Sequence, residues 1–143
     1  MRHTLRFSLR RDADDLTLDE IRQRVERAMG CSLSPGGERY NMFLFQGSIL
    51  GMEILLGEWH GIEDRRTFQL HGGTPAPMDG GSEDYSVTSI DEVVIDLLAV
   101  RDAGAWRVPS DEEVIAESEY GARREQEEMA QAAADHEDSD RNE

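Results

Sequence analysis

Residues 39–70, with the sequence RYNMFLFQGSILGMEILLGEWHGIEDRRTFQL, form the longest run rich in apolar residues in this chain. Two apolar segments in it, residues 40–45 and 49–56, are separated by the turn-like tripeptide Gln-Gly-Ser. A third candidate strand follows at residues 66–71. The nearly continuous apolar character of the first two segments is typical of strands that are covered on both faces. This stretch therefore predicts the centre of a β-sheet.

A strand and an amphipathic helix are predicted before this stretch. In residues 4–10, TLRFSLR, apolar and polar side chains alternate, which is the period of a strand with one buried face. Residues 17–30 carry apolar side chains at helical spacing. Thr17 and Glu20 have the spacing of a capping box, and Gly30 is placed to end the helix.

Two loops and a second helix complete the central part of the prediction. Residues 32–38 and 72–86 hold proline and paired glycines, so both are predicted as loops, the second one unusually long. Ser89 and Glu92 repeat the capping-box spacing, and Gly104 is placed to end the helix that follows. The apolar stripe of this helix is expected to cover the sheet. It consists of Ile90, Val93, Val94, Leu97 and Leu98.

The C-terminal part of the sequence predicts a helix that loses its structure. Ser110 and Glu113 form a third capping-box pair. Beyond Gly121 the sequence is acidic and rich in alanine, and Met129 is its one large apolar side chain. Because isolated helices of this kind are marginal in water, we expect fraying and disorder by about Asp135.

Together these segments predict an α+β fold in a single small domain, residues 1–120, followed by an acidic helical-to-disordered tail, residues 121–143. About four mostly antiparallel strands would pack with two to three helices in the order β-α-β-β-β-α-α. A chain of 143 residues is long enough to bury a core of this kind.

The chain is strongly acidic, with a net charge of -16, and the acidity is uneven. Residues 111–143 hold 13 acidic residues and 3 arginines, whereas residues 1–110 hold 18 acidic and 12 basic residues. All basic residues are arginine, and several of them are expected to bind acidic neighbours in the chain. The charge disfavours direct binding of nucleic acid or of an anionic membrane and would attract a basic protein partner. The alternative is that the charge only keeps the protein soluble.

Cys31 is the single cysteine, which excludes an intramolecular disulfide and a cysteine metal cluster. A reducing compartment and a cytoplasmic location are the simplest expectation. The N-terminal residues lack an apolar segment of the kind found in signal peptides. Cys31 follows a predicted helix C-terminus, where a thiolate is disfavoured, so we interpret it as a packing residue.

No catalytic motif stands out in the sequence. His60 and His71 flank a turn rich in carboxylates, and these are ligand types that bind zinc, although their spacing matches no compact zinc signature. The glycine pairs lack the lysine of a phosphate-binding loop and read as flexible turns. We therefore expect neither an enzyme nor a cofactor.

Carboxylates on two predicted loops are the strongest remaining signal. If both loops face the same side, they would present an acidic surface with Trp59 and Tyr85 as apolar anchors, which suits recognition of a basic protein. The alternative is an ordinary acidic exterior, with Trp59 at the rim of the core. The acidic members of this predicted partner-binding set are Glu58, Glu63, Asp64, Asp79, Glu83 and Asp84.

Three functional hypotheses follow. The first is a non-enzymatic binding module, namely an inhibitor or immunity-type protein that neutralises a basic partner such as a toxin nuclease. The second is a structural or assembly subunit, for example a phage-related or accessory protein, whose central strands pair with another chain. The third is a metal-dependent hydrolase that uses His60 and His71.

Overall fold

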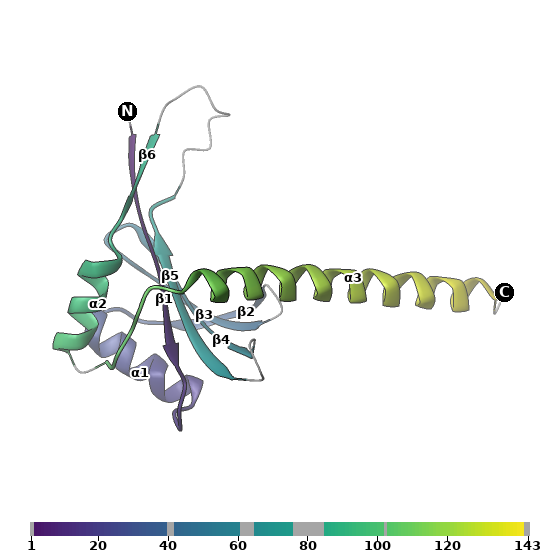
Figure 1. The fold of residues 1–143 in the computed structure, drawn as a ribbon, viewed down its shortest axis with the longest axis horizontal. Helices are drawn as coiled ribbons and strands as arrows, with labels where there is room; N and C mark the ends of the chain where they lie inside the picture. Colours follow the sequence, from purple (N-terminus) through teal and green to yellow (C-terminus); the bar gives the residue numbers. More distant parts are fainter. Residues whose placement is uncertain (1, 40–41, 61–64, 76–84, 102, 142–143) are drawn as a thin grey trace. The chain divides into compact units, whose positions relative to one another are not determined.

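The computed structural model describes residues 2–39, 42–60, 65–75, 85–101 and 103–141 (Figure 1). Its contacts divide the chain into two units, Met1–Pro109 and Ser110–Glu143, and each unit is considered by itself. The sequence predicts a boundary between residues 120 and 121, eleven residues further along the chain.

The described residues form one six-stranded sheet and three helices. The sheet has the order β2-β3-β4-β5-β1-β6. Neighbouring strands are antiparallel except for β1 and β6, which are parallel. The elements are β1 (Arg2–Asp12), α1 (Leu18–Met29), β2 (Ser34–Arg39), β3 (Met42–Ile49), β4 (Met52–His60), β5 (Arg66–Gly73), β6 (Tyr85–Ser89), α2 (Asp91–Val100) and α3 (Asp111–Arg141). The predicted α+β class is confirmed.

The predicted number of strands, about four, was too low, because β2 and β6 were assigned to loops. Strand β2 has the sequence SPGGER, in which proline and glycine are turn signals. It is an edge strand with a shift of register between Pro35 and Glu38, and an edge tolerates proline because one row of its backbone groups needs no strand partner. Strand β6 is short and pairs with β1, a segment far away in the sequence. The local sequences of β2 and β6 do not reveal which strand lies beside them in the sheet.

The main core lies between one face of the sheet and the helices α1 and α2, which Figure 1 shows on the same side of the sheet. Alternate residues of β1, β4 and β5 point to this face. Burying each large aliphatic or aromatic side chain of this kind contributes about 1.5–3 kcal/mol. The fully buried members are Phe7, Leu9, Ile21, Val25, Ile54, Leu56, Phe68, Leu70 and Leu98.

Gly72 lies in strand β5 against the core residue Phe7 rather than in a flexible turn, so the loop prediction for residues 72–86 was wrong at its start. Strand β5 continues through Gly72 and Gly73. Gly72 is the register partner of Phe7, and a Cβ atom at position 72 would collide with the Phe7 ring. Glycine is required here because the aromatic ring of Phe7 lies against the backbone.

The helix α1 follows its sequence prediction closely. Thr17 is the N-cap, and its side chain accepts a hydrogen bond from the Glu20 backbone amide at 3.1 Å. Gly30 ends the helix in the left-handed conformation, with φ of 68°. The buried face consists of Ile21, Val25, Ala28 and Met29.

The helix α2 departs from its prediction in two respects. Ser89 lies in β6 and Ile90 is the N-cap, without a side-chain cap, so the predicted capping box with Glu92 does not form. The expected core stripe is also only partly buried: Val94 and Leu98 face the core, whereas Val93 is 67% exposed. The connection after α2 is held to the core by Trp106, which is 5% exposed.

The unit Ser110–Glu143 consists of α3, within the residues described. Its capping box is confirmed: the Glu113 amide donates to Ser110 Oγ at 3.2 Å, and the Ser110 amide donates to Glu113 Oε1 at 3.1 Å. The helix extends through Arg141, so the predicted disorder from about Asp135 was wrong. After Gly121 the sequence holds no proline and no further glycine, and its alanine, glutamate and glutamine residues are strong helix formers.

Candidate protein-binding surface

Glu58 and Trp59 lie on β4, near the end that leads into residues 61–64. Arg66 Nε donates to Glu58 Oε1 at 2.6 Å, and a second nitrogen of Arg66 donates to the Leu16 carbonyl at 2.8 Å. Trp59 is 5% exposed and lies on the other face of the sheet from Ile54. Both residues thus contribute to the folded unit, and their contact with a partner stays a prediction.

Tyr85 is distant from Trp59. Tyr85 pairs with Arg2 at one end of β1, whereas Trp59 is aligned through Thr67 with Asp12 at the other end. About ten residues of extended chain separate these positions, which corresponds to roughly 33 Å. The two aromatic residues therefore do not share one patch. The remaining predicted contacts lie outside the described residues: Glu63, Asp64, Asp79, Glu83 and Asp84.

His60 and His71 do not converge, so the proposed zinc site on this pair was wrong. The antiparallel register pairs His60 with Arg66 at one end of the β4–β5 hairpin and His71 with Leu55, five residues back along β4. A separation of about five residue steps corresponds to roughly 17 Å, which is too long for two ligands of one ion. Among the residues described, no group of three or more histidine, cysteine or acidic side chains could hold a metal ion.

Cys31 is a half-buried residue that packs against the core. Burial raises the pKa of its thiol, and the negative charge of Glu26 raises it further. Both effects disfavour the reactive thiolate form. The environment of Cys31 is therefore that of a packing residue.

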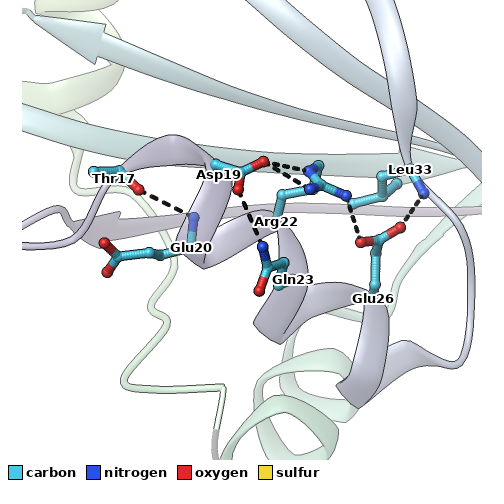
Figure 2. A network of polar contacts seen from close by, with 7 residues as sticks. All are labelled: Thr17, Asp19, Glu20, Arg22, Gln23, Glu26 and Leu33. Carbon is cyan, nitrogen blue, oxygen red and sulfur yellow. Dashed lines mark hydrogen bonds and ion pairs between the residues drawn. The ribbon is translucent and has the colours of Figure 1, made fainter.

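Figure 2 shows how the carboxylates of Asp19 and Glu26 in α1 are bound by residues of the same unit. Arg22 donates to Asp19 at 2.6 Å and to Glu26 at 2.7 Å, and its guanidinium lies 5.2 Å from the centre of the Phe45 ring. The second oxygen of Glu26 accepts the Leu33 amide at 2.9 Å. The hydrogen bond from Arg22 lowers the pKa of Asp19. This network connects α1 to the segment that follows it.

Two other ion pairs follow the same principle. Arg107 binds Asp12 at 3.1 Å, and Arg66 binds Glu58. The expectation that arginines bind acidic neighbours in the chain is confirmed for these residues. In the unit Met1–Pro109, cations thus offset part of the local negative charge.

A hydrogen-bonded serine and histidine lie on the sheet face opposite α1 and α2, and the sequence did not reveal them. Ser8 Oγ lies 3.1 Å from His71 Nδ1, and His71 Nε2 lies 3.3 Å from Gln69 Oε1. Arg10 donates to Ser8 Oγ at 3.0 Å. His71 is followed along this row by Gln69, whose side chain is an amide. An amide cannot stabilise an imidazolium as the carboxylate of a catalytic triad does. We interpret these contacts as a cross-strand polar row.

A polar depression lies beside the β2–β3 edge. Its lining combines hydroxyl and amide groups with one carboxylate: Ser32, Ser34, Gln46, Gly47, Ser48 and Glu53. This lining offers hydrogen bonds to a polar or cationic group but contains no histidine or cysteine that could act as a base or nucleophile.

The outward face of α2 combines aliphatic and acidic side chains. Val93, Leu97 and Val100 are exposed by 67%, 37% and 80%. Glu92 and Asp96 are exposed next to them, and neither carboxylate has a side-chain hydrogen bond or ion pair within the described part of the chain. A signal for this face was present in the sequence, since DEVVIDLLAV holds more apolar residues than one face of a ten-residue helix can bury.

The helix α3 carries most of the net negative charge of the chain. It contains twelve carboxylates and three arginines over 31 residues, a length of about 46 Å. Many of these carboxylates are exposed. The exposed ones are Asp111, Glu112, Glu119, Glu125, Glu127, Glu128 and Asp135.

Within the described residues, none of the helices is long and apolar enough to cross a membrane. The comparisons with known proteins identify no relative of this chain: no protein-family model, no curated protein sequence and no solved structure matches it.

Proposed function

We propose that this protein is a non-enzymatic binding module that neutralises a basic protein partner, as an inhibitor or immunity-type protein does. The observation that carries the proposal is the charge on α3, where twelve carboxylates accompany three arginines. An acidic helix of this length attracts a cationic partner over the range of the Debye length, about 8 Å at physiological salt.

The class of partner follows from the same charge. A nucleic-acid-binding protein carries a basic surface that neutralises phosphates. Carboxylates spaced along a helix can take the place of those phosphates, so a toxin nuclease is a suitable target. Association of this kind is fast at low salt and slows as salt rises.

The test is a pull-down with the full chain from a lysate of the source organism at low salt, followed by a salt gradient. We expect one stoichiometric basic protein. A variant with Glu119→Gln, Glu125→Gln and Glu128→Gln should release it at lower salt. The matched control removes three exposed carboxylates of the other unit: Asp15→Asn, Glu20→Gln and Glu38→Gln.

Two results would contradict the proposal. One is the absence of any basic protein among those retained at low salt. The other is release of the partner at the same salt concentration from both triple variants, because a bulk charge effect needs no binding helix.

A second candidate function, an assembly subunit, needs revision at its contact surface. Strands β3, β4 and β5 each have two neighbours in the sheet, so the central strands offer no free edge for pairing with another chain. Strand β6 is an edge and consists of the uncharged residues Tyr85–Ser89, which suits backbone pairing with a second chain. A molar mass that rises with concentration and does not respond to salt would favour this function.

A further inference from the structure

We infer that the outward face of α2 is a docking surface for a basic amphipathic helix of the partner. This inference rests on the proposed function and adds a specific contact surface to it. The surface consists of Val93, Leu97 and Val100 together with Glu92 and Asp96, and it is called the α2 surface below.

The aliphatic side chains of the α2 surface form one stripe. At 100° per residue, Val93, Leu97 and Val100 fall within an arc of about 60°, and they span about 10 Å along the helix axis. Spacings of four and three residues are those of the anchors through which helices pack side by side. The core of this unit does not use the stripe, because α2 contributes Val94 and Leu98 to it.

The carboxylates border the stripe on one side. Asp96 lies about 40° beyond Val100 around the helix, and Glu92 lies about 40° beyond Asp96. Arg101 stands at the C-terminal end of the opposite border and is exposed. A complementary segment therefore carries aliphatic side chains in a row, with arginine or lysine along one edge of that row.

Charge complementarity favours such a segment over a second copy of this chain. Each copy carries a net charge of -16, and an antiparallel pair of α2 helices would place the two Asp96 carboxylates near the symmetry axis. Like charges this close to an interface oppose association. A basic segment instead gains from both the carboxylates and the aliphatic stripe.

The test uses two synthetic peptides with the same composition of leucine, alanine and lysine. One is amphipathic, with leucines at helical spacing and lysines along one edge, and the other is a scrambled sequence without a periodic stripe. Binding to the isotopically labelled full chain is followed by backbone amide shifts at physiological salt. We expect the amphipathic peptide to shift residues 91–101 and to bind at least tenfold more tightly than the scrambled peptide.

Two double variants separate the contribution of the aliphatic stripe to peptide binding from the contribution of the carboxylates. Val93→Ser with Val100→Ser should weaken binding of the amphipathic peptide about tenfold. Glu92→Gln with Asp96→Asn should weaken it and reduce its salt dependence. The control is Met129→Ser, which removes an aliphatic side chain of similar exposure on α3 and should leave binding unchanged.

The outcomes distinguish this inference from the proposed function. Equal binding of both peptides with shifts confined to α3 would overturn the α2 surface and leave an acidic binding module intact. Self-association that Val93→Ser with Val100→Ser abolishes would also overturn it, in favour of a second copy. If the basic partner retained at low salt binds the Val93→Ser, Val100→Ser variant as tightly as the original chain, the α2 surface is likewise excluded, although the proposed function survives.

Discussion

The aromatic ring of Phe7 lies directly against the backbone of Gly72. The two residues are partners in the antiparallel register of β1 and β5, and the ring occupies the space that a Cβ atom at position 72 would need. The absence of a side chain at Gly72 therefore leaves the space on the core face of β5 that the Phe7 ring occupies.

Substitution of Gly72 should accordingly destabilise the sheet. We expect Gly72→Ala to lower the free energy of unfolding by about 1–3 kcal/mol, because an added methyl group forces the Phe7 ring from its position. The measurement is urea denaturation followed by tryptophan fluorescence. Gly121→Ala is the matched control, since a Cβ atom there meets nothing within 4 Å, and it should leave the midpoint unchanged or slightly raised. Equal midpoints for both variants would show that Phe7 moves without cost.

The two faces of α2 should respond differently to truncation of a side chain. Leu98 is fully buried, so Leu98→Ala should cost about 2–5 kcal/mol, through lost burial and the cavity that remains. Val93 is exposed, and Val93→Ala should change stability by less than about 0.5 kcal/mol. Thermal unfolding of the two variants side by side measures this difference. A large loss for Val93→Ala would mean that its side chain is buried in solution.

Glu26 should stabilise the segment after α1 because its side-chain oxygen accepts a hydrogen bond from this segment, and not only because the side chain is charged. Its carboxylate accepts the Leu33 amide and binds Arg22. Glu26→Ala removes the acceptor and is expected to cost about 1–3 kcal/mol, whereas Glu26→Gln keeps an oxygen in place and should recover part of that loss. Hydrogen exchange at the Leu33 amide measures the effect directly. Glu20→Ala, at an exposed position of the same helix, should not change that exchange rate.

The Asp19–Arg22 pair predicts a dependence on pH with a definite sign. The pKa of Asp19 is lowered in the folded protein, chiefly by the hydrogen bond from Arg22. The pair therefore adds stability above the ordinary pKa of an aspartate, and this contribution is lost as the pH falls through the lower, folded-state value. An NMR titration of the Asp19 carboxyl carbon should show the lowered pKa in the original chain. Arg22→Gln should raise it, whereas Arg24→Gln should have a smaller effect.

Local pattern was sufficient for the amphipathic helix α1, because its caps and its buried face all lie within fourteen consecutive residues. It was insufficient for β2 and β6. The proline and glycines of β2 are compatible with a strand only because that strand lies at an edge, and β6 is a strand only because β1 lies beside it. Both conditions depend on the order of the strands, which local sequence does not contain.

The sequence was likewise sufficient for only part of the candidate surface. The excess of carboxylates could be counted in advance, but their partners could not, since the ion pair of Glu58 with Arg66 depends on the register of a hairpin. The same register separates Trp59 from Tyr85. Conversely, the spacing of Val93 fits the predicted core stripe, but the rotation of α2 about its own axis places it on the exposed side.

The position of β1 between β5 and β6 has a consequence for the order in which this fold can form. Strands β2 to β5 pair with their sequence neighbours, so each hairpin can form as soon as its two strands have been synthesised. Strand β1 precedes them in the chain but pairs Leu9 with Leu70 and Thr4 with Val87. On the ribosome β1 cannot pair before β5 has emerged, so we expect closure of its long loops to be slower than formation of the hairpins. Until then, the apolar side of an unpaired first strand is what a chaperone would encounter.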